Sequence, residues 1–189
     1  MQYQYLAETE MVPADQVCTL KPRINLLAGP PGDPEKLPEM LRGFFAEEGK
    51  HVICGGTTSI LAAEFLHKSL DTILPCHLDP VIPPTARIDG VDLVTEGLIT
   101  IARVLEYAQV YLAGTQAAAP WSTGEDGASQ VARLLFEEAG ALTFYVGSAV
   151  NPAYQADEAA PGYQDKQGLL QELETCLRTM GKPIQVHYF

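Results

Sequence analysis

The chain has few basic residues and no long apolar run. Its 12 lysines and arginines stand against 24 aspartates and glutamates, which gives a formal net charge of −12. Such a surface repels phosphate backbones and anionic lipid, so we expect neither nucleic acid nor a membrane as a partner. No apolar stretch approaches the ~20 residues that a membrane helix needs. The first residues also lack the basic and then apolar pattern of a signal peptide. We therefore expect a cytoplasmic protein.

Cysteine is also sparse, and no two cysteines form a Cys-x-x-Cys pair. The scattered positions predict reduced, mostly buried thiols rather than a disulfide framework; they are Cys18, Cys54, Cys76 and Cys176. The segment 76–79, Cys-His-Leu-Asp, resembles half of a metal site, but the second half that zinc sites show is missing. We therefore expect no bound metal, and the sequence points to no particular cofactor.

The 189 residues, of which 47% are hydrophobic, suffice for one well-cored domain. We expect an N-terminal extension or edge strand over residues 1–22 and a single domain over residues 23–189. Strands are predicted at 23–27, 51–54, 72–74, 85–94 (with a kink at Gly90), 142–146 and 183–189. Helices are predicted at 34–48, 58–70, 98–112, for about ten residues after 127–129, and at 166–180. This alternation predicts an α/β fold, specifically a three-layer, Rossmann-like sandwich with a largely parallel sheet.

The segment 51–59 indicates most clearly where a ligand would bind. A short apolar strand is followed by Gly55 and Gly56, then by the hydroxyl residues Thr57, Thr58 and Ser59, and then by a helix. The amides that begin such a helix are free and carry the positive end of its dipole, which favours a bound anion. The turn lacks the lysine of the Walker phosphate loop and the third glycine of the dinucleotide fingerprint. The alternative is a tight turn with an ordinary helix cap.

Two further segments end predicted strands and begin helices in the same way. The first begins with Gly29 and Pro30, and the second begins with Thr95 and Glu96. Ligands of open parallel sheets bind beyond the carboxyl ends of the strands, so we expect three helix N-termini around one crevice. Glu96 is alternatively a first-turn carboxylate that favours its own helix, or forms a metal, sugar or ammonium site with Asp92. Loop residues that line the pocket in this hypothesis are Trp121 and Asn151.

Cys54 is a candidate nucleophile. It ends a predicted strand against a helix N-terminus, an environment that lowers the pKa of a thiol. No histidine is close in sequence on the same face, because His51 lies three residues back and points to the other side of the strand. The alternative is a small buried apolar side chain.

Several segments together resemble one known family. They are 25–31 (NLLAGPP), 48–58 (EGKHVICGGTT), 88–97 (IDGVDLVTEG), 127–129, 145–155 and 181–186, and they extend over about residues 23–189. In this order and spacing they are similar to the region after the catalytic domain in some stage II sporulation protein E-like serine phosphatases of Firmicutes. The resemblance implies that phosphatase chemistry belongs to the preceding type 2C domain, which holds two divalent metals on aspartates. At most Asp15 would remain of its last motif, and one carboxylate cannot assemble a two-metal site.

The sequence therefore favours an accessory or regulatory domain that binds a small anionic or polar ligand, with a phosphatase or signalling module as an implied partner. An enzyme that uses Cys54 as nucleophile, or the threonine-rich turn for phosphate transfer, is the first alternative. An oligomerisation domain without a ligand is the second, and a homo-oligomer is possible in either case. We expect Gly56→Val to abolish ligand binding without unfolding the protein.

Overall fold

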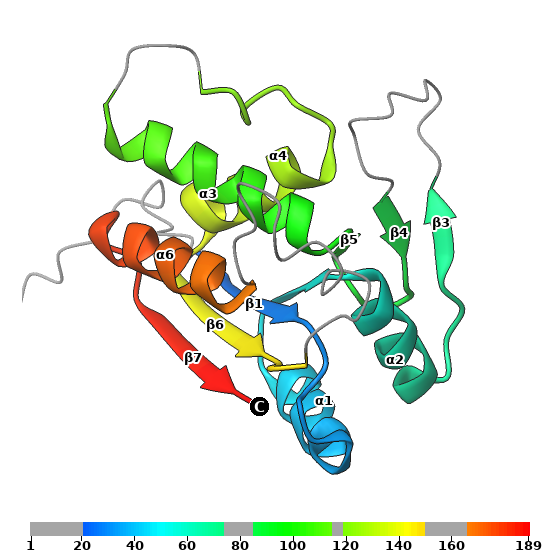
Figure 1. The fold of residues 1–189 in the computed structure, drawn as a ribbon. Helices are drawn as coiled ribbons and strands as arrows, with labels where there is room; N and C mark the ends of the chain where they lie inside the picture. Colours follow the sequence, from blue (N-terminus) through cyan, green and yellow to red (C-terminus); the bar gives the residue numbers. More distant parts are fainter. Residues whose placement is uncertain (1–20, 74–84, 115–118, 150–165) are drawn as a thin grey trace, which may run out of the picture.

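The computed structural model describes residues 21–73, 85–114, 119–149 and 166–189, and its centre is a seven-stranded sheet (Figure 1). The strand order is β3-β4-β5-β2-β1-β6-β7. Five strands, from β5 to β7 in this order, run parallel, and β4 pairs antiparallel with both β3 and β5. The bounds are β1 Arg23–Ala28, β2 Lys50–Cys54, β3 Asp71–Ile73, β4 Thr85–Arg87, β5 Leu93–Thr95, β6 Ala141–Val146 and β7 Ile184–Tyr188. The predicted α/β fold with a largely parallel sheet is confirmed.

Helices pack against both faces of this sheet (Figure 1). On one face, α1 and α2 form an apolar core with alternate strand residues such as Leu27 and Ile53. On the other face, α3, α4 and α6 pack on the intervening residues, such as Leu26 and Val52. Because both faces of β1 are covered, its residues from Ile24 to Ala28 are buried without a break. The helix bounds are α1 Leu37–Ala46, α2 Gly56–Leu66, α3 Leu98–Leu112, α4 Gly127–Ala132 and α6 Lys166–Thr179.

Several predicted boundaries are wrong, each for a local reason. The region 85–94 is not one strand: β4 and β5 are separated by a turn in which Gly90 has a φ of 91°, a value that favours glycine. The helix expected from residue 34 begins as a 3-10 turn, Pro34–Lys36, capped by the Asp33 carboxylate, and becomes α-helical only at Leu37. After α4 the chain continues in a π-helical segment, Arg133–Glu138, labelled η2.

Some expectations cannot be compared with the structure. The edge strand proposed within residues 1–22, the segment 76–79 and Asn151 fall outside the described residues, apart from positions 21 and 22. Among the helices that the structure describes, none has the length and apolar character required to cross a bilayer.

Candidate functional site

The three segments predicted to converge do lie at one edge of the sheet. Strands β5, β2 and β1 are neighbours and parallel, with Cys54 in register with both Thr95 and Ala28. The chain leaves all three strands at their carboxyl ends and enters α3, α2 and the turn before α1, respectively. This edge is where ligands of open parallel sheets bind.

The turn between β2 and α2 is held against the end of β5. Gly55 has a φ of 134°, and its amide donates to the carbonyl oxygen of Thr95 at 2.9 Å. A Cβ on Gly97 would lie 3.2 Å from the Cα of Gly55, so the two loops approach as closely as their backbones allow. The positive φ favours glycine at position 55, and a side chain at position 97 would crowd the contact. The first helical residue, Gly56, has no atom within 4 Å of where its Cβ would be.

The first three amides of α2 have no acceptor within the helix. The amide and the hydroxyl of Ser59 both donate to the Gly55 carbonyl oxygen, at 2.8 Å and 2.7 Å. The preceding N–H groups, on Gly56, Thr57 and Thr58, come before the first helical hydrogen bond, and no side chain caps them. Gly56 and Thr57 are exposed, whereas Thr58 is buried. The free amides are thus those of residues 56–58, and the Ser59 amide is not among them.

Glu96 stabilises the helix that it precedes. Its Oε2 accepts the amide of Ile99 at 3.1 Å, in the first turn of α3. The predicted interaction with the helix start is present, but Glu96 precedes the N-cap, Gly97, rather than lying in the first turn. Asp92 lies at the opposite end of β5, where its Oδ2 accepts the amide of His51 at 2.7 Å. The two carboxylates therefore cannot form a common metal site. In the described ranges, the structure holds no group of three or more His, Cys, Asp or Glu side chains with metal-site geometry.

Cys54 is buried between the sheet and the helices of the α3 side. Its side chain is 2% exposed, and the Thr95 hydroxyl lies 3.3 Å from its Sγ. Burial raises the pKa of the thiol to about 12, with a smaller contribution from the Glu96 charge, while the Thr95 contact opposes the rise. This shift is opposite to the one that a nucleophilic cysteine needs. As expected, His51 points to the other face, where its ring packs on Phe44 at a centroid distance of 4.9 Å.

We expect the Cys54 thiol to stay unreactive at neutral pH. The test is alkylation of a Cys18→Ser, Cys76→Ser, Cys176→Ala variant across a pH series, with the same protein in denaturant as control. The folded protein should react much more slowly than the denatured protein up to about pH 9, the ordinary pKa of the thiol being 9.0. Because the folded-state pKa is raised, the contribution of Cys54 to stability should be constant below pH 9.0 and be lost as the pH rises towards about 12. Rapid alkylation of folded protein near pH 7 would restore Cys54 as a nucleophile.

The loop after β1 packs against the loop after β6. Gly29 is buried, and the carbonyl oxygen of Pro30 accepts the amide of Ala149 at 3.1 Å. The amide of Gly147 donates to the carbonyl oxygen of Ala28 at 3.0 Å. Gly29 and Pro30 thus follow the strand next to β2, as predicted, and their backbones lie against the loop after β6.

Trp121, predicted to line a pocket, instead belongs to the core. Its side chain is 3% exposed and packs edge-on against Phe136, with ring centroids 5.4 Å apart. The indole N–H donates to Glu137 Oε1 at 2.8 Å, which satisfies its polar atom.

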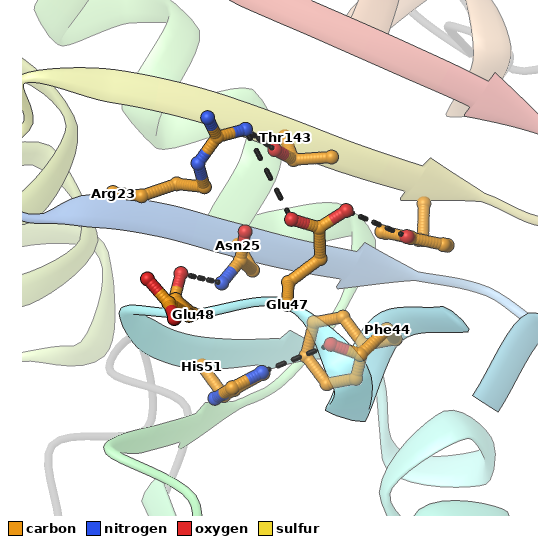
Figure 2. A network of polar contacts seen from close by, with 8 residues as sticks. Arg23, Asn25, Phe44, Glu47, Glu48, His51 and Thr143 are labelled. Atoms are coloured by element: carbon orange, nitrogen blue, oxygen red, sulfur yellow. Dashed lines mark hydrogen bonds and ion pairs between the residues drawn. The ribbon is translucent and has the colours of Figure 1, made fainter. Parts of the chain in front are cut away.

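A polar cluster on the α1 side of the sheet was not predicted (Figure 2). Arg23 donates to the Thr143 hydroxyl at 3.0 Å and lies 4.0 Å from the Glu47 carboxylate. The Tyr145 hydroxyl donates to Glu47 Oε1 at 3.2 Å, and both burial and the Glu47 charge raise the pKa of this tyrosine. These residues come from β1, β6 and the end of α1, so no local sequence pattern joins them.

Asn25, in the middle of the same cluster, is fully buried (Figure 2). Its Nδ2 donates to the carbonyl oxygen of Glu48 at 3.1 Å. Its Oδ1 is the one buried side-chain oxygen or nitrogen of the described residues that lacks a hydrogen-bond partner. The available signal was a polar residue inside the otherwise apolar run Ile24–Ala28 of β1.

Comparison of the chain with protein-family models, curated proteins and solved structures finds no match. The candidate site therefore rests on its own geometry.

Proposed function

We propose that the protein binds a small anionic ligand at the N-terminus of α2. The observation that carries this proposal is the set of three successive amides, on Gly56, Thr57 and Thr58, without an acceptor in the described structure. They stand at the carboxyl edge of a parallel sheet, and two of the three residues are exposed. An anion placed there accepts hydrogen bonds from amides that are already oriented, and it meets the positive end of the helix dipole.

Neighbouring groups would define the ligand further. The exposed Thr57 side chain supplies a hydroxyl beside the amides. Glu96 uses Oε2 for the amide of Ile99, so Oε1 is the atom that would accept a donor from the ligand. Among the residues predicted to bind, Ser59 has its hydroxyl engaged by Gly55, and Gly29 and Pro30 contact the β6 loop. The proposed contacts are therefore concentrated on residues 56–58 and 96.

A regulatory role beside a phosphatase or signalling module remains part of the proposal. It is supported by the resemblance of segments 25–31, 48–58 and 88–97 to the region that follows the catalytic domain of certain type 2C phosphatases. A Rossmann-like, doubly wound arrangement is likewise proposed, supported by helices on both faces of the sheet. The raised pKa of Cys54 weighs against the alternative of a cysteine-dependent enzyme.

Replacement of Gly56 by proline tests the site most sharply. Proline at the first helical position removes one N–H while keeping the helix, since its fixed φ suits that position. The preceding Gly55 has a ψ of 129°, within the range that a residue before proline adopts. Gly56→Ala is the matched control, because it retains the amide and places its Cβ in open space.

The measurement is titration with inorganic phosphate, followed by amide chemical shifts and calorimetry. We expect the wild type and Gly56→Ala to bind with similar affinity and Gly56→Pro to bind at least ~10-fold more weakly, the factor that loss of about 1.4 kcal/mol produces. Because the space around the Gly56 Cβ position is open, we also expect Gly56→Val to fold. Shifts at the amides of residues 56–58 locate the ion. Equal affinity in wild type and Gly56→Pro, or no response to phosphate and sulfate, would refute the proposal.

A further inference from the structure

β7 forms one edge of the sheet, and its outer side pairs with no other strand in the described part of the chain (Figure 1). The pairing with β6 fixes which backbone groups point outward. Pro183 accepts from Leu142, and Phe189 donates to Val146 and accepts from Ser148, so odd-numbered residues of β7 face β6. The N–H and C=O groups of Ile184, Val186 and Tyr188 therefore point away from the sheet. One of them, the Ile184 carbonyl, accepts a hydrogen bond from Arg178 at 3.0 Å and keeps a second lone pair.

Within the described residues, this edge carries less protection against pairing than the opposite edge, although the Arg178 side chain reaches the Ile184 carbonyl. Natural edge strands are commonly short, charged, bulged or interrupted by proline. The opposite edge, β3, has three residues and includes Asp71. β7 has five residues, IQVHY, without a charged aspartate, glutamate, lysine or arginine, and its Tyr188 side chain is 51% exposed. In a chain with a net charge of −12, an uncharged strand at the edge is the segment that can approach another copy with least repulsion.

We propose that β7 pairs antiparallel with β7 of a second copy, which joins two sheets across a two-fold axis. In an antiparallel ladder, the outward-facing residues of the two strands must stand opposite each other. Only a register centred on Val186 uses all three outward residues of both copies. In that register Val186 faces Val186 of the second copy, and Ile184 faces its Tyr188. Such an interface is isologous and therefore closes at a dimer.

Side chains on both faces of the joined strands suit this register. On the α6 side, each Ile184 meets a Tyr188 ring, and an aromatic residue opposite a β-branched one is a favourable cross-strand pair. On the α1 side, Gln185 meets His187, so no like charges are opposed at neutral pH. A second copy fits this edge better than an unrelated strand because the sequence of β7 complements itself. One strand pair buries little area, so the dimer should dissociate on dilution.

The test is the concentration dependence of mass, measured by sedimentation equilibrium and light scattering. We expect the wild type to dimerise on concentration, with hydrogen exchange of the Val186 and Tyr188 amides slowing as dimer forms. Val186→Pro removes the outward N–H, a change that edge strands tolerate, and should leave a folded monomer at every concentration. Val186→Thr is the matched control: it keeps the N–H and the β-branch, and should dimerise like the wild type.

Tyr188→Lys tests the same interface independently if Val186→Pro does not fold. Tyr188 is half exposed, so lysine there leaves the monomer intact but places a charge against Ile184 of the second copy. We expect a monomer. A wild type that stays monomeric to its solubility limit would overturn the proposal. Protected Val186 and Tyr188 amides in a monomer would also overturn it, since another segment of the same chain would then cover the edge. A dimer that neither Val186→Pro nor Tyr188→Lys weakens would overturn it as well.

Discussion

Gly147→Ala is expected to lower the free energy of unfolding by about 3 kcal/mol, the upper part of the range for overpacking. A Cβ at this position would overlap the carbonyl groups of Pro30 and Gly29, which are backbone atoms and cannot rotate away. The chain cannot retreat either, because the Gly147 amide is bonded to Ala28 and the Ala149 amide to Pro30. Relief of the overlap therefore requires separation of the loops after β1 and β6.

Gly168→Ala is the matched control for this substitution. Gly168 lies inside α6, where an added Cβ meets nothing within 4 Å, so alanine should stabilise the protein by about 0.5–1 kcal/mol through helix propensity. Urea denaturation of both variants measures the difference. If Gly147→Ala unfolded at the wild-type midpoint with an unchanged slope, the close approach of the two loops would be contradicted.

This contact also determines the shape of the proposed binding site. The loops after β1 and β6 are in backbone contact at Gly147 and Pro30, and those after β2 and β5 at Gly55 and Gly97. Within the described residues, the seam between β1 and β6 and the seam between β2 and β5 are thus closed at this edge. At these two seams the geometry favours an anion seated on the exposed end of α2 over one buried in a cleft between strand ends.

Elements with strong periodicity were predicted almost to the residue. The helix Leu98–Leu112 has its expected bounds because apolar residues recur at helical spacing along its whole length. The strand Ala141–Val146 was predicted because it is rich in β-formers. The antiparallel pair of β3 and β4 could not be read as such, since each strand has three residues and exists through its pairing.

The candidate site was predicted in position but not in detail. Gly55 and Gly56 marked the turn, because two glycines before a hydroxyl-rich helix start are a local signal. That the Gly55 amide binds Thr95 depends on β5 lying beside β2, which only the sheet order reveals. The raised pKa of Cys54 has the same origin: the helices that bury it come from distant parts of the chain.

Asn25→Val is expected to raise the free energy of unfolding by about 1–3 kcal/mol. Asn25 Oδ1 is buried without a partner, and a buried unsatisfied polar atom costs about 1–3 kcal/mol. Valine also buries more apolar surface in the centre of a strand. The substitution removes the hydrogen bond from Asn25 Nδ2 to the Glu48 carbonyl, which is typically worth about 1 kcal/mol. Because Glu48 is exposed, water can replace Nδ2 as the donor to this carbonyl.

Thr143→Val on the neighbouring strand provides the matched control. Thr143 is equally buried, but its hydroxyl has a partner in Arg23, so the same kind of substitution should destabilise the protein by about 1 kcal/mol. Opposite signs for the two variants in urea denaturation would identify Asn25 as a polar group that the fold retains against its own stability. Such groups concentrate where function constrains the sequence, which would make the Arg23–Asn25–Glu47 face the next surface to probe with ligands. Equal destabilisation by both variants would instead mean that Asn25 is satisfied within the fold, and the expectation for Asn25→Val would be wrong.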